Sequence, residues 1–382
     1  MSQRLTVCYF GTYRANYARN QIMIAGLRAA GVTVIECHMP LWKGVEDRVR
    51  ITQGGWASLS FASRILSTYT QLLLKYFRLK ADYDVMVLGY PGQIDVFLAR
   101  LLTRLKGKPL VIDILMSVYL VAVERNLLES RPITRRVIRF LEGVGGYLPD
   151  LLIFNTKEYI NWYHKTYNIC LSNSCLVPMG VDDRVFRPVE VTRATNGVVK
   201  VLYYGTFIQN HGVEYIIEAA NLLRDKEYIH FELIGSGPTR NMAQTLVNKY
   251  QLKNVTFTGW VEKDQLPVKI AAADICLGVF SFTPQSYMTV HNKIYEGLAM
   301  RKAVVTGDSP TIRETFQHKT HLYLVERANP RALADALLTL QANPDLRARL
   351  AEEGHRKVAN EFSTAALGQI LRTHLETLIK KH

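Results

Sequence analysis

The stretch His291-Asn-Lys-Ile-Tyr-Glu-Gly-Leu-Ala-Met-Arg-Lys-Ala-Val-Val-Thr306 decides the fold of this chain. Ile294 and Leu298 stand at helical spacing, so the first part predicts a short helix. After a turn at Arg301, the β-branched run 303–306 predicts a buried strand. A helix followed at once by a buried strand is typical of an α/β protein with a parallel sheet.

Two charged residues of this stretch suggest a ligand. Lys293 and Glu296 are three positions apart and therefore share one face of the predicted helix. The helix start near His291 presents unbonded N–H groups and the positive end of the helix dipole, which suits a phosphate. A lysine can neutralise a phosphate while a glutamate accepts hydrogen bonds from a pair of sugar hydroxyls. Nucleotide binding is one hypothesis, and a solvated ion pair on an ordinary helix is the alternative.

Length and composition indicate a globular protein with an anionic partner. The chain has 382 residues and 48% hydrophobic residues, which fits two domains of ordinary size. Lys and Arg number 47 against 33 Asp and Glu, a net charge of +14. Residues 1–190 hold 24 of these bases and 15 of these acids, so most of the excess lies in the first half.

The cysteines and the hydropathy pattern predict a cytoplasmic protein. The five cysteines are odd in number and lack metal-ligand spacing, which favours a reducing compartment. The first ten residues are too short and polar for a signal sequence, and no apolar run approaches the length of a membrane span. The cysteines are Cys8, Cys37, Cys170, Cys175 and Cys276.

Alternation of strand-like and helix-like segments predicts two doubly wound, Rossmann-like α/β domains that face each other across a cleft. We expect the first domain at residues 1–187 and the second at 199–363. The polar segment 188–198 has no periodicity and is interpreted as a linker. The helix expected at about 364–382 is predicted to pack back on the first domain.

Glycine follows three predicted strands of the second half, at Gly205, at Gly235 and Gly237, and at Gly259 just before Val261. A glycine at a strand end allows the backbone to approach a phosphate or a base closely. Taken one at a time, such glycines are more often plain turn residues. Together with the helix at 291–296, they make four candidate ligand-binding elements.

These elements together form a recognisable pattern. The second half resembles glycosyltransferase family 4, whose members are retaining sugar-nucleotide enzymes of the GT-B fold. The first half resembles the same family more loosely, through Tyr9-Phe10-Gly11-Thr12-Tyr13 and Pro178-Met179-Gly180-Val181-Asp182. The matching segments of the second half are Gly205-Thr206-Phe207, His211-Gly212-Val213-Glu214, Ile234-Gly235-Ser236-Gly237-Pro238, Phe257-Thr258-Gly259-Trp260-Val261, Ala273-Asp274-Ile275 and Asn292-Lys293-Ile294-Tyr295-Glu296.

The resemblance implies roles for individual residues. Glu296 matches the glutamate that binds the donor ribose, the backbone around Val261 would meet the base, and the helix start at Asn292 and Lys293 would meet the diphosphate. It also implies sugar transfer from a nucleoside-diphosphate sugar to a lipid-linked or glycan acceptor in cell-envelope or polysaccharide assembly, without a metal or other cofactor. The remaining donor-binding candidates in this half are Gly205, Thr206, His211, Gly235 and Gly237.

The sequence departs from the family pattern at three places. Thr206 and His211 occupy positions where many members carry Arg and Lys, and Met288 replaces an acidic residue that touches the transferred sugar. The first domain has Asp113 and its neighbours where many members offer a histidine. Lys293 is then the main fixed cation for the diphosphate. These departures also leave open a GT-B scaffold that binds a nucleotide or glycan without transferring it.

The first domain offers its own candidates. Gly11, Arg14 and Arg19 lie at a strand end and the next helix start, where an arginine either reaches the donor phosphates or an acceptor, or is simply solvated. Asp113 ends another strand, where it either orients the sugar or acceptor hydroxyl as a catalytic residue or caps the next helix.

Residues 42–80 combine tryptophans, leucines and basic residues as membrane-interfacial segments do. Peripheral attachment to an anionic membrane is one interpretation, and a core-facing amphipathic helix is the other. Nucleic-acid binding lacks support because no basic stripe is interleaved with stacking aromatics. The histidines have no ligand spacing, so we expect no metal site.

Overall fold

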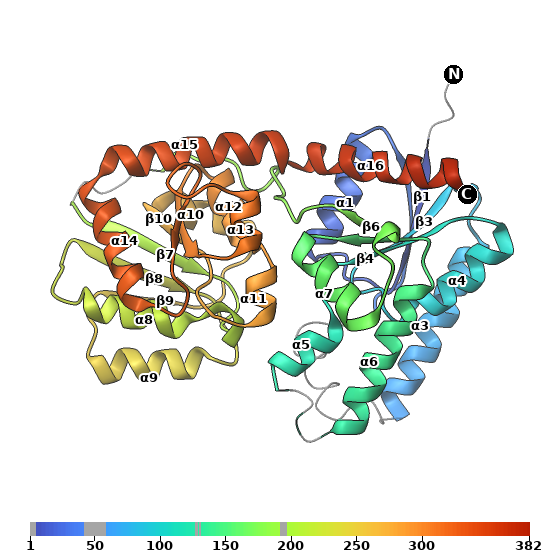
Figure 1. Cartoon of the computed structure of the whole chain (residues 1–382), viewed down its shortest axis with the longest axis horizontal. Coiled ribbons are helices and arrows are strands. Elements are labelled where there is room, and N and C mark those ends of the chain that lie inside the picture. The colour runs from blue at the N-terminus through green and yellow to red at the C-terminus, as the bar shows by residue number, and fades with distance from the viewer. Residues whose placement is uncertain (1–4, 42–58, 127–128, 130, 192–196) are drawn as a thin grey trace. The chain divides into compact units, whose positions relative to one another are not determined.

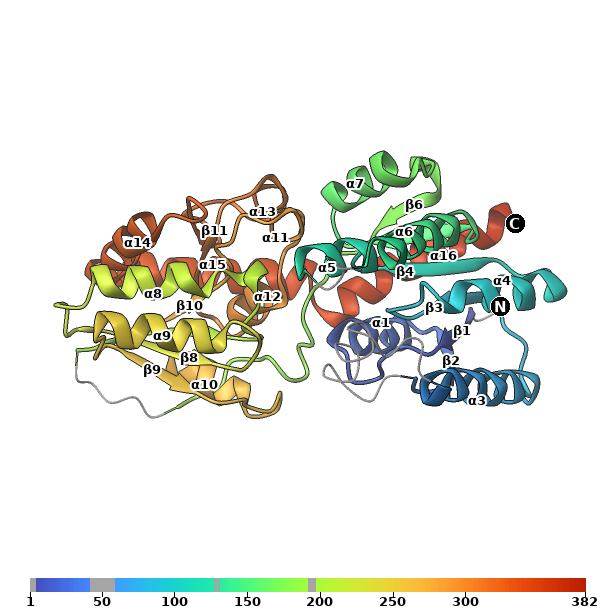
Figure 2. The same cartoon turned by 90° about the horizontal axis from the view of Figure 1, so that it is seen from below.

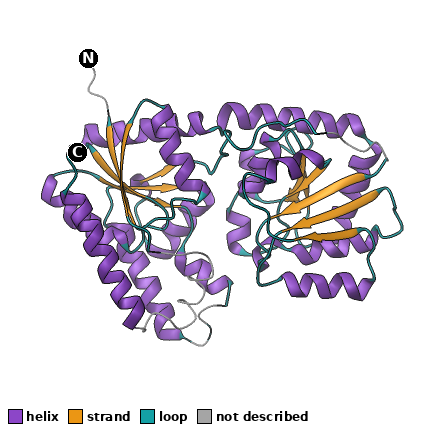
Figure 3. Cartoon of the chain, turned by 180° about the vertical axis from the view of Figure 1, so that it is seen from behind, coloured by secondary structure: helices purple, strands orange, loops and turns teal. Residues whose placement is uncertain are grey.

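The computed structural model describes residues 5–41, 59–126, 129, 131–191 and 197–382. The chain folds as two compact units. Unit 1 consists of residues 1–178 and 364–382, and unit 2 of residues 179–363. Figure 3 shows strands flanked by helices in both units.

Unit 1 is built on a parallel sheet with the strand order β2-β1-β3-β4-β5-β6. The chain starts at β1, adds β2 on one side, and continues with β3 on the other, so the strand order reverses between β1 and β3. Its elements are β1 (Thr6–Gly11), α1 (Ala18–Ala29), β2 (Thr33–His38), α3 (Leu59–Phe77), β3 (Val85–Leu88), α4 (Asp95–Lys106), β4 (Leu110–Ile114), α5 (Val118–Glu124), α6 (Pro132–Tyr147), β5 (Leu151–Phe154), α7 (Lys157–Tyr167), the 3-10 turn η2 (Leu171–Asn173), β6 (Ser174–Leu176) and α16 (Thr364–Lys381).

Helix α16 completes the core of unit 1. Leu371 and Leu375 are fully buried in the cluster that contains Val7 of β1 and Met23 of α1. Figure 1 shows α16 beside α1. The two helices approach closely because glycines face each other, Gly26 on α1 and Gly368 on α16, and a Cβ on either would overlap the backbone of the other helix.

Unit 2 is built on a second parallel sheet, with the order β12-β11-β10-β7-β8-β9. Counted from its first strand, this is the dinucleotide-fold order 3-2-1-4-5-6, which reverses between β7 and β10. Its elements are β7 (Val199–Tyr204), the 3-10 turn η3 (Gln209–His211), α8 (Val213–Leu222), β8 (Ile229–Ile234), α9 (Arg240–Tyr250), β9 (Val255–Thr258), α10 (Leu266–Ala272), β10 (Ile275–Leu277), α11 (Pro284–Met288), α12 (Asn292–Ala299), β11 (Ala303–Gly307), α13 (Pro310–Thr315), β12 (Tyr323–Val325), α14 (Pro330–Ala342) and α15 (Pro344–Glu361).

The predicted α/β class with two Rossmann-like sheets is confirmed. The helix and strand expected from residues 291–306 are also present, as α12 and β11. Between them, Arg301 adopts a left-handed backbone conformation with φ of 54°. This residue turns the chain directly from the helix into the buried strand.

The division between the units lies earlier than the boundary expected at residue 187. Residues 179–187 belong to unit 2. The Val181 N–H donates to the Phe362 carbonyl, and the Asp182 carboxylate pairs with Lys263 at 3.0 Å. These bonds attach the segment to unit 2, although it precedes the first strand of that unit.

Replacing Gly368 by Ala should lower the free energy of unfolding by about 1–3 kcal/mol, because the added methyl group forces α16 away from α1. Urea unfolding followed by circular dichroism measures this change. Gln369→Ala, at the neighbouring exposed position of the same helix, is the control and should leave the midpoint nearly unchanged. Equal midpoints for Gly368→Ala and the wild type would contradict the close helix contact.

Candidate functional site

The reversal of strand order in unit 2 marks the expected ligand position. In doubly wound sheets, ligands bind outside the carboxyl ends of the strands at the point where the order reverses. In unit 2 this point lies between β7 and β10. Gly205 follows β7 directly, with φ of 139°. A Cβ on Gly205 would lie 3.1 Å from the Lys293 ammonium nitrogen, so the structure brings these two predicted residues together.

Lys293 is a buried cation held against aromatic side chains. It is 6% exposed, and its Nζ lies 4.1 Å from the centre of the Tyr203 ring and 3.4 Å from His211 Nδ1. Among the described residues, no carboxylate lies within ion-pair distance of this ammonium group. Burial lowers the pKa of Lys293 to about 7, and the nearby charge of Glu296 opposes that shift. An anionic ligand at this point would restore the lost stabilisation of the charge.

His211 is fixed by the loop that follows β7. Its Nδ1 lies 2.7 Å from the Thr206 carbonyl oxygen and 2.8 Å from the Tyr203 hydroxyl. Because a carbonyl oxygen only accepts hydrogen bonds, Nδ1 carries the proton. His211 therefore lies beside Lys293 and is joined to Thr206 through the Thr206 backbone carbonyl.

Glu296 lies one helical turn after Lys293. Burial raises the pKa of Glu296 to about 7, while the Tyr204 hydroxyl, Lys263 and Lys293 oppose the shift. The Tyr204 hydroxyl also donates to the Lys293 carbonyl at 3.1 Å. The carboxylate thus stands among hydrogen-bond donors and cations in a partly buried position, which suits an acceptor for hydroxyl groups.

The N-terminal end of α12 has no side-chain cap. His291 precedes the helix in an extended conformation without capping it, and Asn292 is the first helical residue. The first N–H groups of a helix need an acceptor from outside the helix. This end of α12 can therefore receive an anion next to Lys293.

The glycines after β8 serve to pack two loops together. A Cβ on Gly235 would overlap the Gly205 carbonyl, and one on Gly237 would contact the Phe207 backbone. Both glycines have left-handed φ values, 133° and 150°. They support the loop after β7 from behind, so their contribution to a ligand site is indirect.

Val261 lies in the loop after β9, which is tied to the start of unit 2. Two residues later, Lys263 bonds the Asp182 carboxylate, which also binds Arg184 at 2.8 Å. The charge of Lys263 acts on the pKa of Glu296, which places this loop near that carboxylate. Val261 itself is partly exposed in this loop.

Arg327 is a second buried cation that sequence reasoning missed. It follows β12, is 6% exposed, and donates to the Asp308 carbonyl at 2.6 Å and the Ser281 carbonyl at 2.8 Å. Its Nη2 and the Nδ1 of His291 are buried without a hydrogen-bond partner. Arg327 and Lys293 both lower the pKa of His291, so all three groups lie close together. Its position two residues after the short apolar strand β12 is the signal that could have revealed it.

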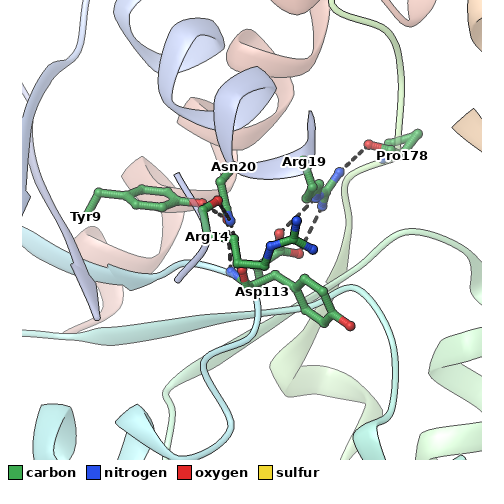
Figure 4. Close-up of polar contacts among 7 residues, drawn as sticks. Tyr9, Arg14, Arg19, Asn20, Asp113 and Pro178 are labelled. Atoms are coloured by element: carbon green, nitrogen blue, oxygen red, sulfur yellow. Dashed lines mark hydrogen bonds and ion pairs between the residues drawn. The ribbon is translucent and has the colours of Figure 1, made fainter. Parts of the chain in front are cut away.

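In unit 1, Arg19 and Asp113 bind each other. Both are fully buried, and Arg19 Nε and Nη2 donate to the two oxygens of Asp113 at 2.8 and 3.1 Å. The remaining terminal nitrogen donates to the Pro178 carbonyl (Figure 4). This geometry argues against the predicted contact of Arg19 with a phosphate and against the predicted catalytic role of Asp113, because each side chain already satisfies the other.

Gly11 and Arg14 have different surroundings. A Cβ on Gly11 would overlap the buried carboxylate of Asp95, which accepts from the Thr12 N–H at 2.6 Å. The Asp95 side chain therefore occupies the space beside Gly11 in which a ligand was expected. Arg14 is partly exposed with its guanidinium over the Tyr17 ring, so it is the predicted unit 1 residue with an accessible charge.

Within the described ranges, no group of three or more His, Cys, Asp or Glu side chains is placed to hold a metal ion.

Comparison with known proteins places these features in a family context. The family model described as "Glycosyl transferases group 1" matches residues 199–343. The alpha-D-kanosaminyltransferase of Streptomyces kanamyceticus is 31% identical over 173 residues, 45% of this chain and 44% of that protein. This chain therefore matches less than half of that relative. A GDP-mannose-dependent alpha-(1-6)-phosphatidylinositol monomannoside mannosyltransferase of Mycobacterium tuberculosis is 24% identical, covering 89% of this chain and 88% of that protein.

Solved structures share the complete fold. Sucrose-phosphate synthase from Thermosynechococcus elongatus aligns with a TM-score of 0.73 at 17% identity over 100% of both chains. Anabaena HepE in complex with UDP aligns with a TM-score of 0.68 at 13% identity, covering 98% of this chain and 100% of that one. At these identities the likeness shows the fold, which is that of the GT-B glycosyltransferases.

The low pKa of Lys293 predicts how its replacement changes stability with pH. Below pH 7 the ammonium is charged in both the folded and unfolded states, and the folded state bears the cost of its burial. Between pH 7 and 10.5, Lys293 is neutral when folded and charged when unfolded, so wild-type stability rises with pH. Lys293→Met should thus gain most stability below pH 7, and its gain should shrink toward pH 10.5.

Urea unfolding of the protein without nucleotide, repeated across this pH range, measures the difference. Lys269→Met provides the control, because Lys269 is 42% exposed. A constant difference between Lys293→Met and the wild type at every pH would contradict the buried, titrating ammonium.

Proposed function

We propose that the protein is a glycosyltransferase of the GT-B fold that transfers a sugar from a nucleoside-diphosphate sugar with retention of configuration; its residues 199–343 match the group 1 glycosyltransferase model. One observation carries this proposal: the buried ammonium of Lys293, which has no carboxylate partner among the described residues, lies at the reversal of strand order beside Gly205. The acceptor is a glycan or a lipid-linked glycan.

The proposed donor position follows the charges of unit 2. The diphosphate lies at the uncapped start of α12, against Lys293 and Asn292. The ribose hydroxyls donate to Glu296, and the base lies along the backbone near Val261. Lys293 precedes Glu296 along α12, so a donor in this orientation has its diphosphate at the cation and its ribose at the carboxylate. The loop after β7, with Gly205 and Thr206, lies at the phosphate end.

Arg327 supplies positive charge that the loop after β7 lacks. Thr206 and His211 are not permanent cations, whereas Arg327 and Lys293 both lie near His291 at the start of α12. A diphosphate that leaves as an anion needs such charge in the transition state. We propose that Arg327 and Lys293 share this task.

The relatives support the class of donor. HepE was solved with UDP and with UDP-glucose, and the mycobacterial relative is described as GDP-mannose-dependent. UDP-glucose and GDP-mannose are both nucleoside-diphosphate sugars, and they differ in the base. The shared chemistry is the diphosphate and the ribose, which are the groups that Lys293 and Glu296 suit.

A retaining reaction on this fold can proceed without a side chain that acts as general base. The acceptor hydroxyl attacks the anomeric carbon from the side of the leaving group. The bond from that carbon to the phosphate oxygen breaks as the new glycosidic bond forms. The departing phosphate oxygen takes the proton of the hydroxyl, so no general base is required from the protein. Lys293 then stabilises the charge on the phosphate.

We further propose that the acceptor is carried on a lipid and that the enzyme works at the cytoplasmic face of a membrane, in cell-envelope or polysaccharide assembly. Support comes from the relatives described as acting on phosphatidylinositol monomannoside or in lipopolysaccharide core biosynthesis. Unit 1, with the partly exposed Arg14, is the proposed acceptor domain.

Lys293→Ala should lower the rate of sugar release by about 10²- to 10³-fold, because it removes the fixed charge at the leaving group. A thermal-shift screen of UDP-, GDP- and ADP-sugars first identifies a donor that stabilises the fold. Hydrolysis of that donor, labelled in the sugar, then measures turnover. Lys269→Ala is the control, and wild-type turnover in Lys293→Ala would refute the role of the ammonium.

Glu296→Ala should weaken binding of the matching nucleoside diphosphate by about 10- to 100-fold, because the carboxylate loses hydrogen bonds from two hydroxyls. Isothermal titration with the nucleotide and with its 2′-deoxy form separates this contact from others. The 2′-deoxy form should bind the wild type and the variant with a much smaller difference. Glu352→Ala, at an exposed position, is the control. An undiminished preference for the ribose form in Glu296→Ala would exclude this assignment.

A further inference from the structure

Helices α3, α4 and α6 form one layer of unit 1, with α4 in the middle. The Tyr69 hydroxyl of α3 donates to Asp95 of α4 at 2.6 Å. On the other side, Gly145 of α6 packs against Val96 of α4. Figures 1 and 2 show the three helices running beside one another. Their outward-facing side chains therefore belong to one continuous surface, which we call the α3–α4–α6 face.

This face concentrates large apolar side chains in solvent. Eleven of the twenty large hydrophobic residues exposed in the described part of the chain lie on these three helices. Ile133 is 76% exposed, Leu105 74% and Phe140 67%. Monomeric soluble proteins seldom expose contiguous apolar patches of this kind without an interaction to serve. The eleven residues are Leu66, Leu74, Phe77, Phe97, Leu101, Leu105, Ile133, Val137, Phe140, Leu141 and Tyr147.

The charges on the same helices have one sign. Their only two acidic residues are Asp95 and Glu142, and both are buried. Asp95 is bonded to Thr12 and Tyr69, and Glu142 accepts from Ser117 and from nearby backbone N–H groups. The exposed charges of the three helices are therefore all positive. They are Lys75, Arg104, Lys106, Arg135, Arg136 and Arg139.

We infer that the α3–α4–α6 face docks on the surface of an anionic lipid bilayer. Apolar side chains that enter the acyl boundary and cations that contact lipid phosphates are the two contributions that hold peripheral proteins on membranes. Long basic side chains can reach the headgroups while their stems lie along the apolar region. No described helix is long and apolar enough to cross the bilayer, so the contact is peripheral.

The charge pattern argues against the main competing occupant, a second copy of the same face. Two copies would bring their arginines and lysines together without an acidic partner, and like charges across an interface are costly. An anionic bilayer instead provides the opposite charge over the full width of the face.

This inference extends the membrane segment expected at residues 42–80. Residues 42–58 lie outside the described residues, so of that segment the face includes α3 alone. Helices α4 and α6 were not expected to take part. The docking does not depend on the proposed sugar transfer, because it involves unit 1 residues that have no role at the donor.

Sedimentation of the full chain with vesicles tests the inference. One set of vesicles is pure phosphatidylcholine, and the other contains about 30% phosphatidylglycerol. Two variants address the two contributions, Leu105→Ser with Phe140→Ser for the apolar contact and Arg104→Glu with Arg136→Glu for the charge. The control is Leu222→Ser with Val268→Ser, which removes exposed apolar residues from unit 2. Circular dichroism verifies that all variants are folded.

The wild type and the control should bind the anionic vesicles, and each face variant should bind about tenfold or more weakly. High salt should release the protein in part. Failure of the wild type to bind, or binding that the face variants do not weaken, would overturn the inference. Concentration-dependent dimerisation that Leu105→Ser with Phe140→Ser abolishes, without vesicle binding, would overturn it in favour of self-association. Donor hydrolysis in the face variants reports separately on the proposed transfer.

Discussion

Unit 2 holds an ammonium group that is largely shielded from water and has no carboxylate of the described residues within ion-pair distance. Lys293 is held against the ring of Tyr203 and beside the backbone of Gly205, at the point where the strand order reverses. Burial of a charge is costly unless something compensates it, and here the compensation inside the protein is incomplete. Gly205, the Thr206 carbonyl that holds His211 and the uncapped start of α12 surround this position.

Unit 1 has the same kind of fold, but its buried cation is neutralised by a carboxylate of the same unit. Arg19 is also fully buried near the carboxyl ends of a parallel sheet, but Asp113 neutralises its charge, and all three of its nitrogens donate hydrogen bonds, to Asp113 and to the Pro178 carbonyl. A cation that is satisfied within the chain holds structure together, and Pro178 is the residue at which the chain leaves unit 1. The buried cation of unit 1 is therefore used within the protein, whereas the buried cation of unit 2 is left for an anion to neutralise.

Local patterns were sufficient to predict much of this architecture. The apolar spacing of Ile294 and Leu298 and the run after Arg301 specify α12 and β11 because both depend on neighbours in sequence. The proximity of Lys293 to Gly205 followed from topology. The pairing of Arg19 with Asp113 could not be predicted, because the two residues are 94 positions apart and either could equally have faced solvent.

Gly235 and Arg327 illustrate two further limits. A strand-end glycine looks the same in sequence whether it faces a ligand or, as Gly235 does, a neighbouring loop. Arg327 belongs to no recognised pattern, and its importance comes from three strand ends that meet only in the folded sheet. The exposure of apolar side chains on α4 and α6 could not be predicted from the sequence either, because both helices have the periodicity of ordinary amphipathic helices.

The contact of α16 with α1 has a consequence for how the chain is made. Leu371 and Leu375 fill the core of unit 1, yet they are separated from the rest of that unit by all of unit 2. During synthesis on the ribosome, residues 179–363 emerge before residues 364–382, so unit 2 can complete its core first. Unit 1 must wait with an incomplete hydrophobic cluster until α16 arrives. Its folding is thereby coupled to translation of the whole chain, and a message cut short after unit 2 would yield a folded unit 2 joined to an incompletely folded unit 1.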